Sequence, residues 1–190
     1  FAFLDIRINE EKSKYLNWYN IDFSIKSEFN DNFDYEGWQG CKDLVKFNLE
    51  NNEVREYLLS VLKYWIETFK IDGLRLDAAH LMSHAFLQEI SSFAKARNPD
   101  FWLLGEAIHE NYTSFLESTN IDSCTDYQLY EQFHKCFNEN NFYILNYELE
   151  RQFGNNGIYK NKPLYLFADN QDVNRVASNL IDPQYLVPLY

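Results

Sequence analysis

The sequence predicts an α/β fold with a parallel sheet, and two observations support this prediction. Short apolar segments recur along residues 71–190, and longer segments with helical periodicity separate them. This alternation is typical of β-α-β units, whose successive strands lie parallel. With 190 residues, 46% of them apolar, the chain is large enough to bury a core.

The first 50 residues differ from the rest of the chain. They show no long helical period and are rich in Asn, Asp and aromatic residues, as in FNDNFDYEGWQG. We expect an irregular region of loops and short strands here. A stretch of this length without regular structure is unusual in a compact domain unless it has a function.

A long helix is expected next, over residues 51–70. Its apolar positions follow i, i+3, i+4, i+7 spacing, so one face is predicted to be buried, with Trp65 on it. Asn51 or Asn52 can cap its start. These apolar positions are Val54, Tyr57, Leu58, Val61, Leu62, Trp65, Ile66 and Phe69.

Four strand–helix repeats are expected after this helix. Asp72-Gly73 provides a turn into the first strand, and Asn98-Pro99 ends the helix that follows it. The predicted strands are 73–77, 101–107, 121–127 and 164–169, and the predicted helical segments are 82–97, 111–118 and 128–152.

Polar residues follow three of these strands. In a parallel sheet the carboxyl ends of the strands share one edge, where active sites lie. Strand alternation puts Arg75 and Asp77 on one face, so the arginine is expected to hold the aspartate ionised, as a nucleophile requires. Glu106 follows Leu103, Leu104 and Gly105, apolar surroundings that suit a protonated general acid. Asp169, Asn170 and Asp172 follow the last strand.

One ionised and one protonated carboxyl on neighbouring strands is the arrangement used for retaining glycoside hydrolysis. A single aspartate at a strand end is more often a turn residue or a helix cap. Three acidic clusters at successive strand ends favour the catalytic interpretation, although composition alone does not define the reaction.

Three motifs carry a family resemblance. DGLRLDAAH, LLGEAIHE and FADNQD resemble, in order, three short regions of the alpha-amylase family, glycoside hydrolase family 13. The stretch from YEGWQG to GLRLD, with LVKFN at 44–48, is similar to the neopullulanase and cyclomaltodextrinase branch. The resemblance implies a (β/α)₈ TIM barrel, of which residues 51–190 would supply about strands four to seven and residues 1–50 an irregular excursion after the third strand.

The resemblance also implies roles for individual residues. Asp77 matches the nucleophile, Arg75 the arginine that keeps it ionised, and Glu106 the general acid/base. Asp172 matches the third carboxylate, which binds sugar hydroxyls and stabilises the transition state. Substrate-binding roles are implied for Arg75, His80, His109, Asn170 and Gln171.

The implied activity is retaining hydrolysis of α-glucosidic bonds, mainly α-1,4, in starch-derived oligosaccharides or cyclodextrins. A sugar acceptor in place of water would give transglycosylation. The alternative is a carbohydrate-binding or partner-binding relative without turnover. Phe33, Tyr35 and Trp38 are candidates either for stacking on sugar rings or for local core, and the core interpretation is favoured.

The sequence departs from the family pattern at several positions. Gln171 stands where the family usually has a histidine, so substrate binding is expected to be altered. Ala79, His80 and Leu81 match neither common acceptor-side pattern. Ile108 replaces the usual tryptophan of the branch, while His109 keeps its expected place.

The resemblance leaves half of the barrel unaccounted for. We therefore expect the isolated 190-residue chain to be weak or inactive, and its open sheet edges predict self-association or domain swapping. No cofactor is required for the implied reaction. Asn48 and nearby acids offer oxygen ligands to Ca²⁺, but the family's calcium site also uses the absent segment, so no calcium site is predicted. His84 and His134 have no partner at metal-ligand spacing.

Other sequence features restrict partners and location. A formal charge of −12 argues against nucleic-acid binding, and no apolar run is long enough for a membrane helix. Cys41, Cys124 and Cys136 form no CxxC, and their odd number argues against a disulfide framework. FAFLDIRINE shows no signal-peptide pattern, so a cytoplasmic location is favoured; secretion is left open because the chain does not begin with Met.

Overall fold

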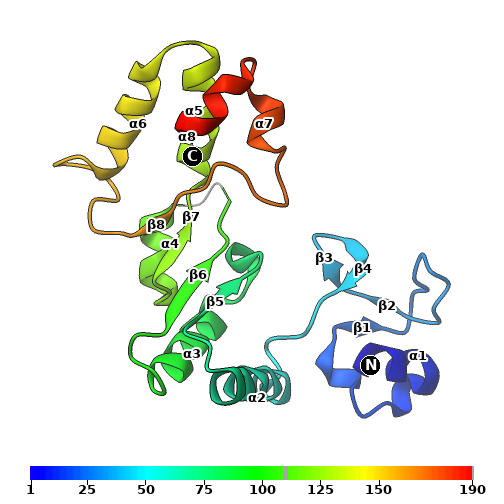
Figure 1. Cartoon of the computed structure of the whole chain (residues 1–190). Coiled ribbons are helices and arrows are strands. Elements are labelled where there is room, and N and C mark those ends of the chain that lie inside the picture. The colour runs from blue at the N-terminus through cyan, green and yellow to red at the C-terminus, as the bar shows by residue number, and fades with distance from the viewer. Residues whose placement is uncertain (109–110, 190) are drawn as a thin grey trace. The chain divides into compact units, whose positions relative to one another are not determined.

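The computed structural model describes residues 1–108 and 111–189, and the chain forms two compact units, Phe1–Phe69 and Lys70–Tyr190 (Figure 1). The division lies after the long helix, whereas the sequence suggested a change of texture at about residue 50. Each unit has its own sheet structure. Among the described residues, no helix has both the length and the apolar character needed to cross a bilayer.

The first unit combines helices with two small antiparallel pairs of strands. Strand β1 (Ile21–Asp22) pairs with β2 (Asp34–Tyr35), and β3 (Gly37–Trp38) pairs with β4 (Cys41–Val45). Helix α1 (Ala2–Asn9) precedes them, followed by short 3₁₀ turns at Glu10–Lys12 and Leu16–Trp18. The predicted loops and short strands are therefore present, but helix α1 was not predicted.

Helix α1 is specified by tertiary packing rather than by periodicity. Ile6 is fully buried, whereas Leu4 and Ile8 on the same helix are exposed, so no apolar stripe marks it in the sequence. Phe3 makes an edge-to-face contact with Tyr35, with ring centroids 4.6 Å apart. The core that this helix joins consists of Ile6, Trp18, Tyr19, Phe33, Tyr35 and Val54.

This aromatic core decides between two roles that the sequence left open. Phe33 and Tyr35 are 1% and 4% exposed, which confirms that they are core residues. Trp38 is 41% exposed and does not belong to the core. A role in stacking on a ligand is therefore still open for Trp38 only.

Helix α2 (Asn52–Phe69) has nearly the predicted bounds, and the Asn51 side chain accepts a hydrogen bond from the Glu53 N–H at 2.8 Å. The predicted burial of Trp65 is wrong, because 41% of this residue is exposed. The aromatic core of the first unit contacts the N-terminal half of the helix through Val54, Tyr57 and Leu58.

The second unit is built on a parallel sheet of four strands in the order β5-β6-β7-β8. The strands are β5 (Gly73–Leu76), β6 (Trp102–Gly105), β7 (Ser123–Thr125) and β8 (Leu164–Tyr165). All three pairings are parallel, as the sequence predicted. This arrangement is the partial (β/α)₈ barrel expected from strands four to seven.

Helices connect these strands, as β-α-β units require. They are α3 (His84–Lys95), α4 (Tyr112–Thr119), α5 (Tyr127–Asn138) and α6 (Phe142–Phe153); α7 (Val176–Asn179), a 3₁₀ turn (Pro183–Tyr185) and α8 (Leu186–Leu189) follow β8. The predicted helical segment 128–152 is two helices, since Asn140 between them has a left-handed φ of 50°.

The last strand is shorter than the predicted 164–169. Its neighbour β7 has only three residues, and the register ends at Thr125 opposite Tyr165. The Asp126 N–H then donates to the Tyr165 carbonyl at 3.0 Å, and α5 begins at the next residue. Residues 166–169 thus continue past the point where β7 turns into a helix, and they lie outside the strand.

Candidate active site

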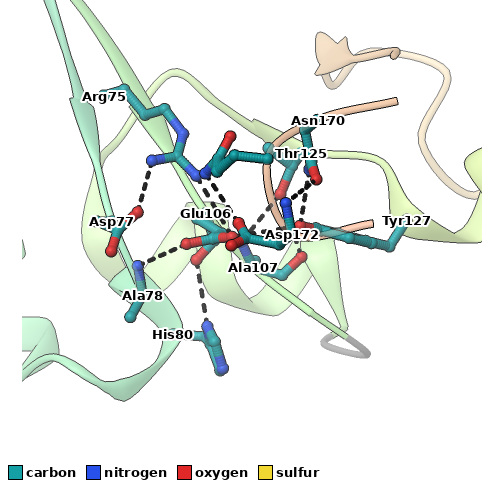
Figure 2. Close-up of polar contacts among 11 residues, drawn as sticks. Arg75, Asp77, Ala78, His80, Glu106, Ala107, Thr125, Tyr127, Asn170 and Asp172 are labelled. Carbon is teal, nitrogen blue, oxygen red and sulfur yellow. Dashed lines mark hydrogen bonds and ion pairs between the residues drawn. The ribbon is translucent and has the colours of Figure 1, made fainter. Parts of the chain in front are cut away.

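The parallel sheet brings polar side chains from four strands to one edge (Figure 2). Arg75 lies in β5, and Asp77 follows that strand. Glu106 follows β6, Tyr127 begins the helix after β7, and Asn170 follows β8. The strand-end clusters predicted from the sequence therefore lie close together, although up to 97 residues separate them in the chain.

One guanidinium joins the two predicted catalytic carboxyl groups. Arg75 Nη1 lies 2.6 Å from Asp77 Oδ1, and Nη2 of the same side chain lies 3.3 Å from Glu106 Oε1. The Asp77 side chain is 78% exposed, whereas that of Glu106 is only 7% exposed. Arg75 therefore links an accessible carboxylate to a buried carboxyl group on the neighbouring strand.

The charge of Arg75 is well supported. Partial burial lowers the pKa of its guanidinium, but the hydrogen bond to Asp77 and the negative charges of Glu106, Asp77 and Asp172 outweigh it, so the net pKa is raised. The guanidinium is a permanent positive charge at the centre of the site. The negative charges of three carboxyl groups of the predicted site, Asp77, Glu106 and Asp172, stabilise this positive charge.

Two hydrogen-bond donors and the Arg75 guanidinium contact the Glu106 carboxyl group. Its Oε2 accepts from the Ala78 N–H at 2.8 Å, and its Oε1 accepts from the Tyr127 hydroxyl at 3.2 Å and faces Arg75. Its backbone N–H donates to the Leu76 carbonyl at 2.9 Å, which extends the ladder between β5 and β6. The carboxyl group is buried, as predicted, but its immediate neighbours are polar rather than apolar.

The residue after Asp77 has a strained backbone. Ala78 adopts a left-handed conformation, with φ 46° and ψ 35°, which is uncommon for a residue with a Cβ. This conformation points the Ala78 N–H at Glu106 Oε2. Strain of this kind persists where surrounding contacts hold it and is concentrated at active sites.

His80 lies against the backbone of the same glutamate. Its N–H donates to the Glu106 carbonyl at 3.2 Å, and its ring Nδ1 lies 3.3 Å from that carbonyl oxygen. His80 thus belongs to the cluster that the sequence predicted. His109, the other predicted histidine, lies outside the described residues.

Hydrogen bonds link the residues of the segment after β8 to one another and to Tyr127. Asn170 Nδ2 donates to the Tyr127 hydroxyl at 3.0 Å, and Asn170 Oδ1 accepts from the Asp172 N–H at 2.9 Å. Gln171 Nε2 donates to Asp172 Oδ2 at 2.8 Å. Asp169, by contrast, binds Arg175 and the Val176 N–H, so it caps α7.

The comparisons with known proteins agree with this geometry. The family model described as "Alpha amylase, catalytic domain" matches residues 5–187. The chain belongs to the alpha-amylase family. This membership accounts for the parallel sheet and for the strand-end positions of the motif residues, both of which the sequence predicted.

Relatives within the family carry the names of the predicted branch. The chain is 39% identical over 128 residues to a maltogenic alpha-amylase from Bacillus acidopullulyticus, covering 67% of this chain and 21% of that protein. It is also 39% identical over 126 residues to a cyclomaltodextrinase from a Bacillus species, covering 66% and 22%. The chain thus spans about a fifth of the length of these curated relatives.

A solved structure supports the fold over nearly the whole chain. The ligand-free cyclic alpha-maltosyl-(1→6)-maltose hydrolase from Arthrobacter globiformis superposes with a TM-score of 0.78 at 26% identity. The match covers 94% of this chain and 40% of that one. The amylase-family chain described here therefore corresponds to less than half of the relative's chain.

Two contributors to the site were missed from the sequence. Tyr127 contacts both Glu106 and Asn170, and the Thr125 hydroxyl accepts from the Ala107 N–H at 3.2 Å. Both lie at the carboxyl end of β7, within the segment 121–127 that was predicted to be a strand.

Metal ligation has little support in the described part of the chain. There, no group of three His, Cys, Asp or Glu side chains is arranged to hold a metal ion. The Asn48 side-chain oxygen Oδ1 accepts from the Glu50 N–H at 3.1 Å and so stabilises a turn. Cys41 is exposed, Cys124 and Cys136 are buried, and all three are free thiols.

Proposed function

We propose that this amylase-family chain carries the catalytic carboxyl groups of a retaining glycoside hydrolase that cleaves α-glucosidic bonds. One observation carries the proposal: a single arginine contacts an accessible aspartate and a buried glutamate at the ends of neighbouring parallel strands. Two carboxyl groups in different surroundings are suited to two different roles in acid/base and nucleophilic chemistry.

In the first step Asp77 attacks the anomeric carbon of the substrate. Its side chain is accessible, and the ion pair with Arg75 holds its carboxyl group at the end of β5. The bond from the anomeric carbon to the leaving oxygen breaks, and that oxygen takes the proton of Glu106. The products of this step are a glycosyl ester of Asp77, the shortened sugar and a Glu106 carboxylate.

In the second step the Glu106 carboxylate removes a proton from water. The water oxygen bonds to the anomeric carbon while the ester bond to Asp77 breaks, which regenerates both carboxyl groups and retains the configuration. A sugar hydroxyl in place of water gives transglycosylation by the same steps. His80, which contacts the Glu106 backbone carbonyl, is one residue that would influence the balance between water and sugar acceptors.

The substrate class proposed is maltooligosaccharides and cyclodextrins with α-1,4 bonds. The support comes from relatives named maltogenic alpha-amylase and cyclomaltodextrinase. Asp172 and Asn170, on the segment after β8, would bind sugar hydroxyls through carboxylate and amide groups. Gln171, bound to Asp172 rather than aimed away from it, would orient that carboxylate.

The stereochemical course of the reaction tests the proposal. The full-length protein is incubated with maltotriose or a cyclodextrin, and proton NMR follows the anomer released first. We expect the α-anomer first, and no release with Asp77→Asn. Initial release of the β-anomer, or undiminished turnover in Asp77→Asn, would refute the proposed mechanism. Full-length protein that binds these sugars without cleaving them would favour the non-catalytic alternative.

For the 190-residue chain alone we propose weak or absent turnover and self-association. Among the described residues β5 and β8 are the edges of the sheet, and each presents an unpaired side to solvent. Activity assays and light scattering over a range of concentrations test both points. Normal turnover by a monomeric chain would contradict them.

A further inference from the structure

The Tyr127 hydroxyl lies between two predicted site residues from different strands. It donates to Glu106 Oε1 at 3.2 Å and accepts from Asn170 Nδ2 at 3.0 Å, as Figure 2 shows. These two contacts use its proton and one of its lone pairs. The tyrosine therefore connects the glutamate after β6 to the loop after β8.

The surrounding structure fixes this tyrosine. The residue is 7% exposed, and its ring makes an edge-to-face contact with Phe167 at 4.9 Å. Its backbone N–H donates to the Tyr112 hydroxyl at 3.1 Å. It is the first residue of α5, and the Asp126 side chain caps that helix through the Leu129 N–H. The direction of the hydroxyl is thus set by a helix cap, a ring contact and a backbone bond.

The hydroxyl keeps its proton at neutral pH. Burial raises the pKa of Tyr127, and the nearby charge of Glu106 acts in the same direction, whereas the bond from Asn170 lowers it; the net pKa is above that of a free tyrosine. Because Asn170 occupies the acceptor side of the phenol oxygen, the O–H points to Glu106. Tyr127 is therefore a fixed donor to that carboxyl group.

We propose that Tyr127 is a positioning residue for the acid/base Glu106. This inference rests on the proposed function and deepens it. Glu106 becomes a carboxylate as its proton moves to the leaving oxygen, and a hydroxyl donor bonds a carboxylate more strongly than it bonds a carboxylic acid. Tyr127 thus stabilises the charge that develops on Glu106 in the first step, while Asn170 holds the phenol oxygen in place.

The decisive variant is Tyr127→Phe in the full-length protein, because it removes one hydroxyl and keeps the ring. With maltotriose we expect kcat/KM to fall about 10-fold, the size of effect typical of one hydrogen bond to a charged group. The alkaline limb of the pH profile should move up by about one pH unit, because the carboxylate has lost a donor. With α-maltosyl fluoride, whose leaving group needs no proton, the fall should be less than about 2-fold.

Tyr130→Phe is the matched control. The Tyr130 ring stacks on the same Phe167, with centroids 5.0 Å apart, and its hydroxyl interacts with Asn179 instead of Glu106. We expect the control to keep the wild-type pH profile and the wild-type ratio between the two substrates.

An unchanged pH profile in a folded Tyr127→Phe enzyme would overturn the inference, whatever its overall activity. If this variant fails to fold, 3-fluorotyrosine at position 127 replaces it, because it keeps the shape and is a stronger donor. The alkaline limb should then move down, and an upward or absent shift would overturn the inference. Asp77→Asn and Glu106→Gln test the proposed function separately. If either variant keeps full activity, the proposed function is refuted. If both are inactive and Tyr127→Phe leaves the pH profile unchanged, only the positioning role is refuted.

Discussion

The end of β5 and the ends of β6 and β7 are built in opposite ways. At the end of β5, the Asp77 side chain is 78% exposed and forms an ion pair with Arg75. At the ends of β6 and β7, Glu106, Thr125 and Asp126 are buried and bonded to backbone N–H groups or to other fixed donors. The difference teaches that an accessible nucleophile needs room, whereas an acid/base needs a fixed direction and a controlled proton.

The largest effect on activity is expected from replacing the exposed Asp77 at the end of β5. Asp77→Asn removes the proposed nucleophile, so kcat should fall about 10⁴-fold or more on every substrate, including α-maltosyl fluoride. Steady-state assays of the full-length protein with both substrates check this. A loss confined to poor leaving groups would show that Asp77 has the role assigned to Glu106.

Loss of the buried Glu106 carboxyl group should affect the two substrates differently. Glu106→Gln should lower kcat/KM about 10²- to 10⁴-fold on maltotriose, because proton transfer to the leaving oxygen is lost. On α-maltosyl fluoride the first step should be much less affected, which pre-steady-state measurements can resolve. Equal losses on both substrates would contradict the assignment of Glu106 as the acid.

Arg75 joins the two sides, so its replacement sharpens the comparison. Arg75→Lys keeps the charge but loses the planar fork that contacts Asp77 and Glu106 together. We expect kcat/KM to fall about 10- to 100-fold, in line with the loss of one hydrogen bond between charged groups. Arg175→Lys, which alters the contact with Asp169 outside the catalytic group, is the control.

The free energy of unfolding should depend on the buried polar groups at the ends of β6 and β7 and not on the exposed Asp77. Thr125→Val leaves the buried Ala107 N–H without its partner, so the free energy of unfolding should fall by about 1–3 kcal/mol. Asp77→Asn, at an exposed site, should change it by less than about 0.5 kcal/mol. Urea denaturation of the purified chain measures both, with Thr113→Val at an exposed hydroxyl as the control.

The smallest expected effect is a pH dependence at the end of β7. Burial raises the pKa of Asp126, against the opposing effect of the bond from the Leu129 N–H. Between the unfolded pKa of about 3.9 and this raised value, the folded state holds a proton that the unfolded state has lost. The contribution of Asp126 to stability therefore falls as the pH rises above about 4.

Asp126→Asn tests this sign, because Asn caps a helix about as well as Asp. Relative to the wild type, the variant should gain stability as the pH rises through this window, by no more than about 1.4 kcal/mol per pH unit for a single proton. Denaturation curves at a series of pH values give the difference. A difference independent of pH would contradict the prediction.

The elements that could be predicted are those with a local pattern of apolar residues in the sequence. Helix α2 and the strands β5 and β6 were visible because their apolar residues repeat with the period of the element or form a short buried run. Helix α1 was not visible, because its position depends on contacts such as Phe3 with Tyr35, which are distant in sequence. The length of β8 could not be read either, since it is set by the neighbour β7.

The site was predictable to the extent that it follows from strand ends. Arg75, Asp77 and Glu106 were found because polar residues directly after apolar strands stand out. The contact of the Ala78 N–H with Glu106 was not predictable, because a left-handed alanine has no local sequence signal. Tyr127 was not predicted as a site residue, because it was placed inside the weak predicted strand 121–127.

The strand order of the second unit also has a consequence for synthesis of the chain. Each strand pairs with the one made immediately before it, so the sheet can grow in step with translation from β5 to β8. Arg75 and Glu106 can meet as soon as β6 has formed, and Tyr127 joins them with β7. Asn170 and Asp172 come last, after β8, so the site is completed only when the fourth strand has emerged from the ribosome.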